Sequence, residues 1–179
     1  MDVYLEPFSL RHIAKQFRQF NSAVHGDYAR LNPYFWWVRS GNLARFNFIL
    51  SGIIVEKLSY IMRDLPYNKK FIIRYDGDFS GVIGLDGMAQ NAARAELWYF
   101  VTSEYEGKQV ASNALSQLES FAKNKSIGQI YARTLRSNRK SQYLLDKHGY
   151  HHYYPSEDSH KNRDTLMWCK YLNNKNIEK

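Results

Sequence analysis

The stretch from residue 94 to residue 150 constrains the fold more than any other part of the chain. Strand-like and helix-like patterns alternate along it, and Gly149 follows the last helical pattern, where a left-handed residue commonly ends a helix. The expected elements are a strand over 95–102, a helix over 110–125, a strand over 129–135 and a helix over 138–147. Alternation of this kind predicts an α/β unit.

The flanking segments add strands on both sides of this unit. Asp76-Gly77 is a strong turn signal between two apolar runs and predicts a β-hairpin. The further expected elements are a strand over 3–7, a helix after Ser9, an aromatic loop over 26–39, a helix over 42–63, hairpin strands over 71–75 and 79–85, and final strands over 150–154 and 165–171. The order predicts an α/β fold with a mixed, mostly antiparallel central sheet flanked by about four helices.

Length and composition favour one globular unit. The chain has 179 residues, of which 44% are hydrophobic, enough for a core of its own. No apolar run approaches the roughly 20 residues that a membrane span needs, and the N-terminus does not resemble a signal peptide. Cys169 is the single cysteine and cannot form an internal disulfide. We expect a single domain over residues 1–179, no membrane partner and a cytoplasmic location.

The charge favours anionic partners. The formal net charge is +8, which suits a nucleic acid, an acidic protein surface or the phosphates of a cofactor. The basic residues are scattered and no nucleic-acid motif is visible, so nucleic-acid binding is not expected as the main role. His151 and His152 are adjacent in a predicted strand and point to opposite faces, so no metal site is expected.

Three motifs within the central stretch resemble the acetyl-CoA-binding half of the GNAT acetyltransferase superfamily. The strand 95–100 (AELWYF) is similar to the family's Ala-Glu-Ile-Gly-Tyr-Trp, Asn138 and Ser141 match its Asn-x-x-Ser, and residues 144–150 match its closing Leu-x-x-Lys-x-Gly-aromatic pattern. The resemblance implies a GNAT-like fold, acetyl-CoA as co-substrate and no metal. It also implies an acceptor-side part at about 1–66 and an acetyl-CoA-binding part at about 70–155.

The loop over 104–111 is the predicted pyrophosphate site. It opens a helix, whose N-terminus offers free backbone N–H groups and the positive end of the helix dipole. Two residues depart from the family's usual loop: Glu106 stands at a Gln or Arg position, and Gln109 stands at the central Gly. The residues expected to bind the cofactor are Phe100, Val101, Gly107, Lys108, Gln109, Val110, Ala111 and Asn138.

The resemblance also implies two catalytic residues. Glu96 is the candidate base that removes a proton from the acceptor amine. Many family members carry a Tyr that donates to the departing thiolate, but Leu145 occupies that position here, and Ser141 is the candidate in its place. The family strand is commonly bulged and splayed. Trp98 replaces its usual Gly, so the sequence does not decide whether the local backbone has this bulge.

The segment 31–38 (LNPYFWWV) narrows the choice of branch. It resembles the Leu-x-Pro-Trp-Leu-x-Trp-Val segment of RimJ/RimL-type ribosomal-protein N-terminal acetyltransferases, where it flanks the acceptor groove. The resemblance makes Tyr34, Trp36 and Trp37 candidate substrate-binding residues, with a self-packed aromatic loop as the alternative. It implies acetylation of a protein α-amino group. An acidic ribosomal stalk protein would suit the charge of the chain, and a homodimer is compatible with the group.

Three alternatives stay open at this level. The altered loop at Glu106 and Gln109 favours a non-catalytic coenzyme A-binding or protein-interaction module on the same fold. Small amines such as polyamines or antibiotics are other acceptors, although the positive charge disfavours polyamines. A basic nucleic-acid binder would require strongly salt-dependent binding to DNA or RNA.

Overall fold

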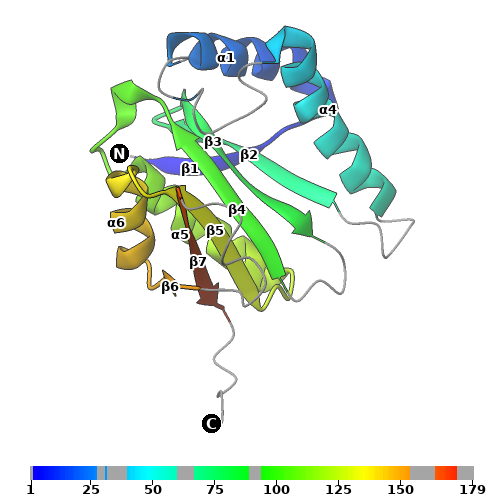
Figure 1. Cartoon of the computed structure of the whole chain (residues 1–179). Coiled ribbons are helices and arrows are strands. Elements are labelled where there is room, and N and C mark those ends of the chain that lie inside the picture. Colours follow the sequence, from blue (N-terminus) through cyan, green and yellow to red (C-terminus); the bar gives the residue numbers. More distant parts are fainter. Residues whose placement is uncertain are drawn as a thin grey trace.

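The computed structural model describes residues 2–27, 31, 40–59, 67–88, 94–153 and 164–172. Its centre is a seven-stranded sheet with the strand order β1-β2-β3-β4-β5-β7-β6 (Figure 1). The strands are β1 Val3–Pro7, β2 Tyr67–Tyr75, β3 Asp78–Met88, β4 Arg94–Val101, β5 Gln129–Leu135, β6 His151–His152 and β7 Thr165–Tyr171. Only the β4–β5 pair is parallel among these strands, which confirms the predicted mixed, mostly antiparallel sheet.

Helices cover both faces of the sheet (Figure 1). The α-helices are α1 Ile13–Gly26, α4 Gly41–Ser59, α5 Val110–Asn124 and α6 Arg139–Lys147, and two short 3-10 helices are η1 Leu10–His12 and η2 Ser103–Tyr105. One hydrophobic core joins α5 and α6 to the sheet, and a second joins α1 and α4 to its other face. Ile73 belongs to the first core and Ile72 to the second, because successive strand residues point to opposite faces.

The element order agrees with the sequence prediction, and the differences lie at element ends. β2 and β3 are longer than the predicted hairpin strands, whereas β6 is only two residues long. The predicted helix over 42–63 is described as far as Ser59, and most of the expected aromatic loop lies outside the described residues. The helix predicted after Ser9 begins as η1, and the Ser9 side chain forms no cap hydrogen bond. None of the helices in the described ranges is long and apolar enough to cross a membrane.

The parallel strands β4 and β5 separate part-way along their length. Their pairing runs from Arg94 opposite Gln129 to Leu97 opposite Ala132. Beyond that point β4 continues to Val101 and β5 to Leu135 without further pairing between them. The sheet is therefore split at these two strand ends, as the resemblance implied for this strand.

The β3–β4 pairing, by contrast, is regular throughout. Its register is unbroken from Gly81 opposite Val101 to Asp86 opposite Glu96, so the implied bulge is not present against β3. Trp98 lies opposite Gly84, and a Cβ added to Gly84 would approach the Trp98 ring to 2.7 Å. Because Gly84 has no side chain, the indole fits in register without a distortion of the strand.

Candidate active site

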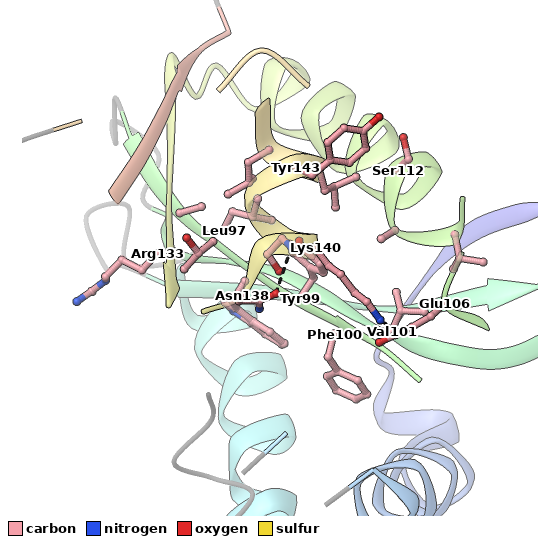
Figure 2. Close-up of a pocket in the computed structure, with 18 of the residues that line it drawn as sticks. Leu97, Tyr99, Phe100, Val101, Glu106, Ser112, Arg133, Asn138, Lys140 and Tyr143 are labelled. Carbon is pink, nitrogen blue, oxygen red and sulfur yellow. Dashed lines mark hydrogen bonds and ion pairs between the residues drawn. The ribbon is translucent and has the colours of Figure 1, made fainter. Parts of the chain in front are cut away.

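A cleft of about 1150 Å³ occupies the split between β4 and β5. Its walls are the ends of the two strands, and the first turns of α5 and α6 close it on one side (Figure 2). The predicted residues that line it are Glu96, Phe100, Val101, Gly107, Gln109, Val110, Ala111, Asn138 and Ser141. The fold thus gathers most of the predicted site around one cavity.

The loop before α5 has the backbone of an anion site. Gly107 has φ of +77° and Gln109 has φ of +59°, both in the left-handed region. Gln109 is the N-cap residue, and its side chain forms no cap hydrogen bond. The first backbone N–H groups of an α-helix have no partner within the helix, so those of α5 remain available to an anionic ligand.

The unusual acid in this loop is paired with a cation. Lys140 Nζ, at the start of α6, lies 2.5 Å from Glu106 Oε2. The Lys140 side chain is largely exposed. The pair neutralises Glu106 at the edge of the cleft and connects the α5 loop to α6.

Lys108 is the one predicted cofactor residue that does not line the cleft. Its Nζ lies 5.0 Å from the ring centroid of Tyr105 and 5.9 Å from that of Tyr75. These cation–π contacts direct the ammonium group toward β2.

Asn138 holds the start of α6. Its side-chain oxygen accepts a hydrogen bond of 3.2 Å from the backbone N–H of Ser141, as an N-cap residue does. Gln142 Nε2 donates to the carbonyl oxygens of Leu135 and Arg136, at 2.9 Å each, and fixes the turn from β5 to α6. These contacts place the first turn of α6 beside the open end of β4.

Two carboxylates face each other at the other end of the cleft. Glu96 forms a bidentate ion pair with Arg133 of β5, with distances of 2.8 and 3.0 Å, and both side chains are substantially exposed. Asp86 lies opposite Glu96 on β3 and accepts a hydrogen bond of 3.0 Å from Trp98 Nε1. Burial raises the pKa of Asp86, while the bond to Trp98 and the charge of Lys70 oppose the shift.

Tyr99 projects from β4 toward α6 with a buried hydroxyl (Figure 2). Burial raises the pKa of this hydroxyl to about 12, although Ser141 opposes the shift. Ser141 is therefore close, yet Tyr99 Oη forms no hydrogen bond of normal geometry with any described residue. Leu145, at the position where many family members carry a Tyr, is fully buried and offers no donor.

The remaining predictions concern the acceptor side and a metal site. Tyr34, Trp36 and Trp37 lie outside the described residues. Among the residues that are described, no group of three or more His, Cys, Asp or Glu side chains could hold a metal ion.

The sequence did not predict that Asp86, Tyr99, Arg133 and Lys140 belong to the site. Their relation to the site depends on strand register and on the contact between α6 and the α5 loop.

Comparisons with known proteins agree with this geometry. The family model described as the acetyltransferase (GNAT) domain matches residues 3–151. RimL, a ribosomal L7/L12 α-N-protein acetyltransferase solved with coenzyme A, has a TM-score of 0.76 at 14% identity over 94% of this chain and 93% of its own. The microcin C7 self-immunity acetyltransferase MccE, solved with acetyl-CoA and AMP, has a TM-score of 0.74 at 13% identity over 95% and 92%.

Mycobacterium smegmatis RimJ, in complex with CoA-disulfide, has a TM-score of 0.68 at 20% identity over 94% of this chain and 81% of its own. No curated protein matches this sequence. At these identities the solved structures show the shared fold, and the family model covers most of the chain. The resemblance predicted from the sequence is confirmed, and this chain belongs to the GNAT acetyltransferase domain family.

Proposed function

We propose that this protein transfers the acetyl group of acetyl-CoA to a primary amine, by direct attack within a ternary complex, and that the preferred acceptor is the α-amino group of a protein. One observation carries the proposal. The cleft between the separated ends of β4 and β5 has an uncapped helix N-terminus at one end and the carboxylates of Asp86 and Glu96 at the other. The first suits a pyrophosphate and the second an amine.

The spacing along β4 suits an extended cofactor arm. Glu96 and Val101 are five residues apart, roughly 16 Å along an extended strand. Beyond Leu97, which lies opposite Ala132, the described part of β4 forms no further strand pairing with β5, and its backbone groups border the cleft. We assign these groups to the pantetheine arm, with Asn138 beside them, and the α5 loop at Gly107 and Gln109 to the pyrophosphate. When the cofactor binds, the ammonium group of Lys140 would leave the carboxylate of Glu106 and contact a phosphate oxygen instead.

Glu96 is the proposed base. Its carboxylate is exposed enough to reach a bound amine, directly or through water, and Arg133 fixes its orientation. Bound acetyl-CoA supplies an activated carbonyl carbon, and the β4 backbone N–H groups offer donors to its oxygen. Asp86 adds a second negative group that favours a cationic acceptor at this end of the cleft.

Two features bear on the acceptor. The net charge of +8 favours an acidic protein substrate, and the solved structures with the same fold include RimL and RimJ. The similarity to MccE, solved with AMP, supports a small-molecule amine as the second candidate. We favour the protein N-terminus, including that of an acidic ribosomal protein, because electrostatic steering acts over a large acidic surface.

The test is an acetylation screen read by mass spectrometry. Purified protein and acetyl-CoA are mixed with peptides that have free N-termini, both acidic and neutral, and in parallel with polyamines and aminonucleosides. We expect mono-acetylation of an α-amino group, with acidic peptides preferred. Acetylation of only the small amines would assign the protein to the second candidate, and no acetylation of any acceptor would favour a non-catalytic coenzyme A-binding module.

The variant Glu96→Gln tests the assigned base. It should lower kcat about 100-fold or more, since a positioned general base contributes about that much, while the affinity for acetyl-CoA stays within about threefold. Asp146→Asn is the matched control, because Asp146 is an exposed acid on α6 that does not line the cleft. Equal kcat values in the two variants would remove Glu96 from the mechanism.

A further inference from the structure

A second cavity, of about 370 Å³, adjoins the cleft. Asp86 and Glu96 line both spaces. The other large side chains in the described part of its wall are Arg94, Tyr131, Tyr153 and Met167. Because the two carboxylates belong to both spaces, an amine bound to them lies where the cleft and the second cavity meet.

The apolar side chains in this wall are not part of the folded core. Tyr131 on β5, Tyr153 after β6 and Met167 on β7 are all half-buried, and none belongs to either hydrophobic core. The rings of Tyr131 and Tyr153 meet edge to face, with their centroids 5.3 Å apart. The Tyr131 hydroxyl donates a hydrogen bond of 2.6 Å to Gln129 Oε1, so this tyrosine contributes its ring to the wall. Such a wall gains most from contact with an apolar group.

The charged groups around the second cavity are largely matched with one another. Arg133 binds both carboxylate oxygens of Glu96, and the charge of Lys70 acts on Asp86. Arg94, at the start of β4, adds a further exposed cation to the wall. A basic group that entered the cavity would be repelled by Arg94. The cavity therefore suits a neutral group better than a second cation.

We propose that the second cavity binds the side chain of the first residue of the acceptor protein and selects a large apolar one, as in methionine or phenylalanine. This inference rests on the proposed function. When the α-amino group lies at Asp86 and Glu96, the first side chain branches from the next atom of the acceptor and enters the second cavity.

The chemistry of the wall favours these two side chains. A methionine sulfur makes favourable contacts with the rings of Tyr131 and Tyr153, and a phenylalanine ring packs on them edge to face. Met167 adapts to either shape, because its side chain is unbranched. A serine or alanine side chain leaves most of the cavity unfilled and gains little from the apolar wall.

The test compares peptides that differ only in their first residue. Four peptides share one sequence from position 2 onward and begin with Met, Phe, Ser or Ala. Acetylation is followed through the thiol of the coenzyme A released. We expect kcat/KM for the Met and Phe peptides to exceed that for the Ser and Ala peptides by about tenfold or more, mainly through KM, because single methylene groups in an apolar pocket already discriminate on that scale.

The variant Tyr153→Ala identifies the cavity as the cause, with Tyr171→Ala as the matched control. Each substitution removes a tyrosine ring that lies against one neighbouring ring, that of Tyr131 for Tyr153 and that of His151 for Tyr171. Tyr171 lines neither the cleft nor the second cavity. In Tyr153→Ala the preference for Met over Ser should fall below about threefold, whereas Tyr171→Ala should keep the wild-type preference.

A second variant covers a loss of folding. Thermal unfolding shows whether each variant is folded, and Met167→Ala replaces Tyr153→Ala if the latter is not. Met167→Ala should lower the preference for the Met peptide in the same direction, because it removes another part of the apolar wall.

The possible failures separate the inference from the proposed function. Equal kcat/KM for the four peptides, or a preference for Ser or Ala, would overturn the inference and leave the acetyltransferase activity in place. An equal loss of preference in Tyr153→Ala and Tyr171→Ala would also overturn it, since the effect would then not come from the second cavity. Acetyl-CoA binding without acetylation of any of the four peptides would overturn both the inference and the proposed protein acceptor.

Discussion

At the residue scale, Lys70 combines a charged side chain with a buried position. Its side chain on β2 is 5% exposed. Lys70 Nζ donates a hydrogen bond of 2.5 Å to the backbone carbonyl oxygen of Phe48. It also lies 3.9 Å from the centroid of the Phe48 ring. Burial lowers the pKa of Lys70 to about 8, although the charge of Asp86 opposes the shift.

This conflict predicts a stability that rises with pH. The folded pKa of Lys70 is about 8 and the unfolded value is 10.5, so its contribution to stability is fully present above 10.5 and is lost as the pH falls through 8. The free energy of unfolding should therefore increase from pH 7 to pH 10 by about 2 to 3 kcal/mol on account of this residue. Urea denaturation at the two pH values measures the increase.

Lys70→Met should remove that increase, because methionine does not titrate. Lys57→Met is the control, since Lys57 is exposed on α4. If Lys70→Met and Lys57→Met show the same dependence on pH as the wild type, Lys70 is not charged and buried in the way described.

The site residues differ in how far the sequence could predict them. Glu96, Asn138 and Ser141 were predicted because they stand at fixed positions in local motifs, and all three line the cleft. Asp86 was not predicted, because only the antiparallel register of β3 and β4 brings it opposite Glu96. Tyr99 was seen as part of a strand motif, and nothing in that motif shows that its hydroxyl is buried without a partner.

At the element scale, the start of α6 combines a structural and a ligand-binding role in Asn138, and two substitutions separate them. Asn138→Asp keeps the oxygen that caps α6 but loses the amide N–H groups. We expect a stability close to that of the wild type and an acetyl-CoA affinity about tenfold lower. Asn138→Ala should lose the same affinity and, in addition, about 1 kcal/mol of stability.

Calorimetry with acetyl-CoA and urea denaturation measure the two effects. Wild-type affinity in Asn138→Asp would show that Asn138 is a helix cap alone.

The start of α5 is strained at Gln109, which has φ of +59°. A non-glycine residue in this region costs of order 1 kcal/mol, which glycine avoids. Gln109→Gly should therefore stabilise the protein by about 0.5 kcal/mol and keep or improve acetyl-CoA affinity. Asn113→Gly, in the exposed part of α5, should instead destabilise by about 0.5 to 1 kcal/mol. If urea denaturation showed the same loss of stability in both variants, the backbone at Gln109 would not be strained.

The elements themselves were largely predictable, and their ends were less so. The helix predicted over 110–125 is α5 Val110–Asn124, because its apolar residues recur at helical spacing. The strand predicted over 150–154 is only His151–His152, since pairing with β7 and not the local pattern sets its length.

At the scale of the whole molecule, the sheet is continuous on the β1–β4 side and splits between β4 and β5, and the split contains the cleft. The order of elements predicted the sheet but not the point of separation. That point is set by the pairing between two strands that are separated in the chain by α5, and local sequence patterns do not contain such a pairing.

The net charge of +8 predicts an electrostatic contribution to acceptor binding. For an acidic peptide, kcat/KM should fall by about tenfold as NaCl rises from 50 to 500 mM, because salt screens attraction beyond a few ångströms. A neutral peptide of the same length should change less than about twofold. If salt changed kcat/KM equally for both peptides, the positive charge of the protein would not contribute to binding of the acceptor.

The measurement that tests the central claim most directly is a calorimetric titration of the purified protein with acetyl-CoA, with desulfo-coenzyme A and ADP as controls. The cleft, the uncapped start of α5 and the separation of β4 from β5 together predict one site with micromolar affinity for acetyl-CoA and weaker binding of ADP. No binding of acetyl-CoA at millimolar concentration would mean that Glu106 and Gln109 have disabled the pyrophosphate site, and it would contradict the assignment of this protein as an acetyl-CoA-dependent enzyme.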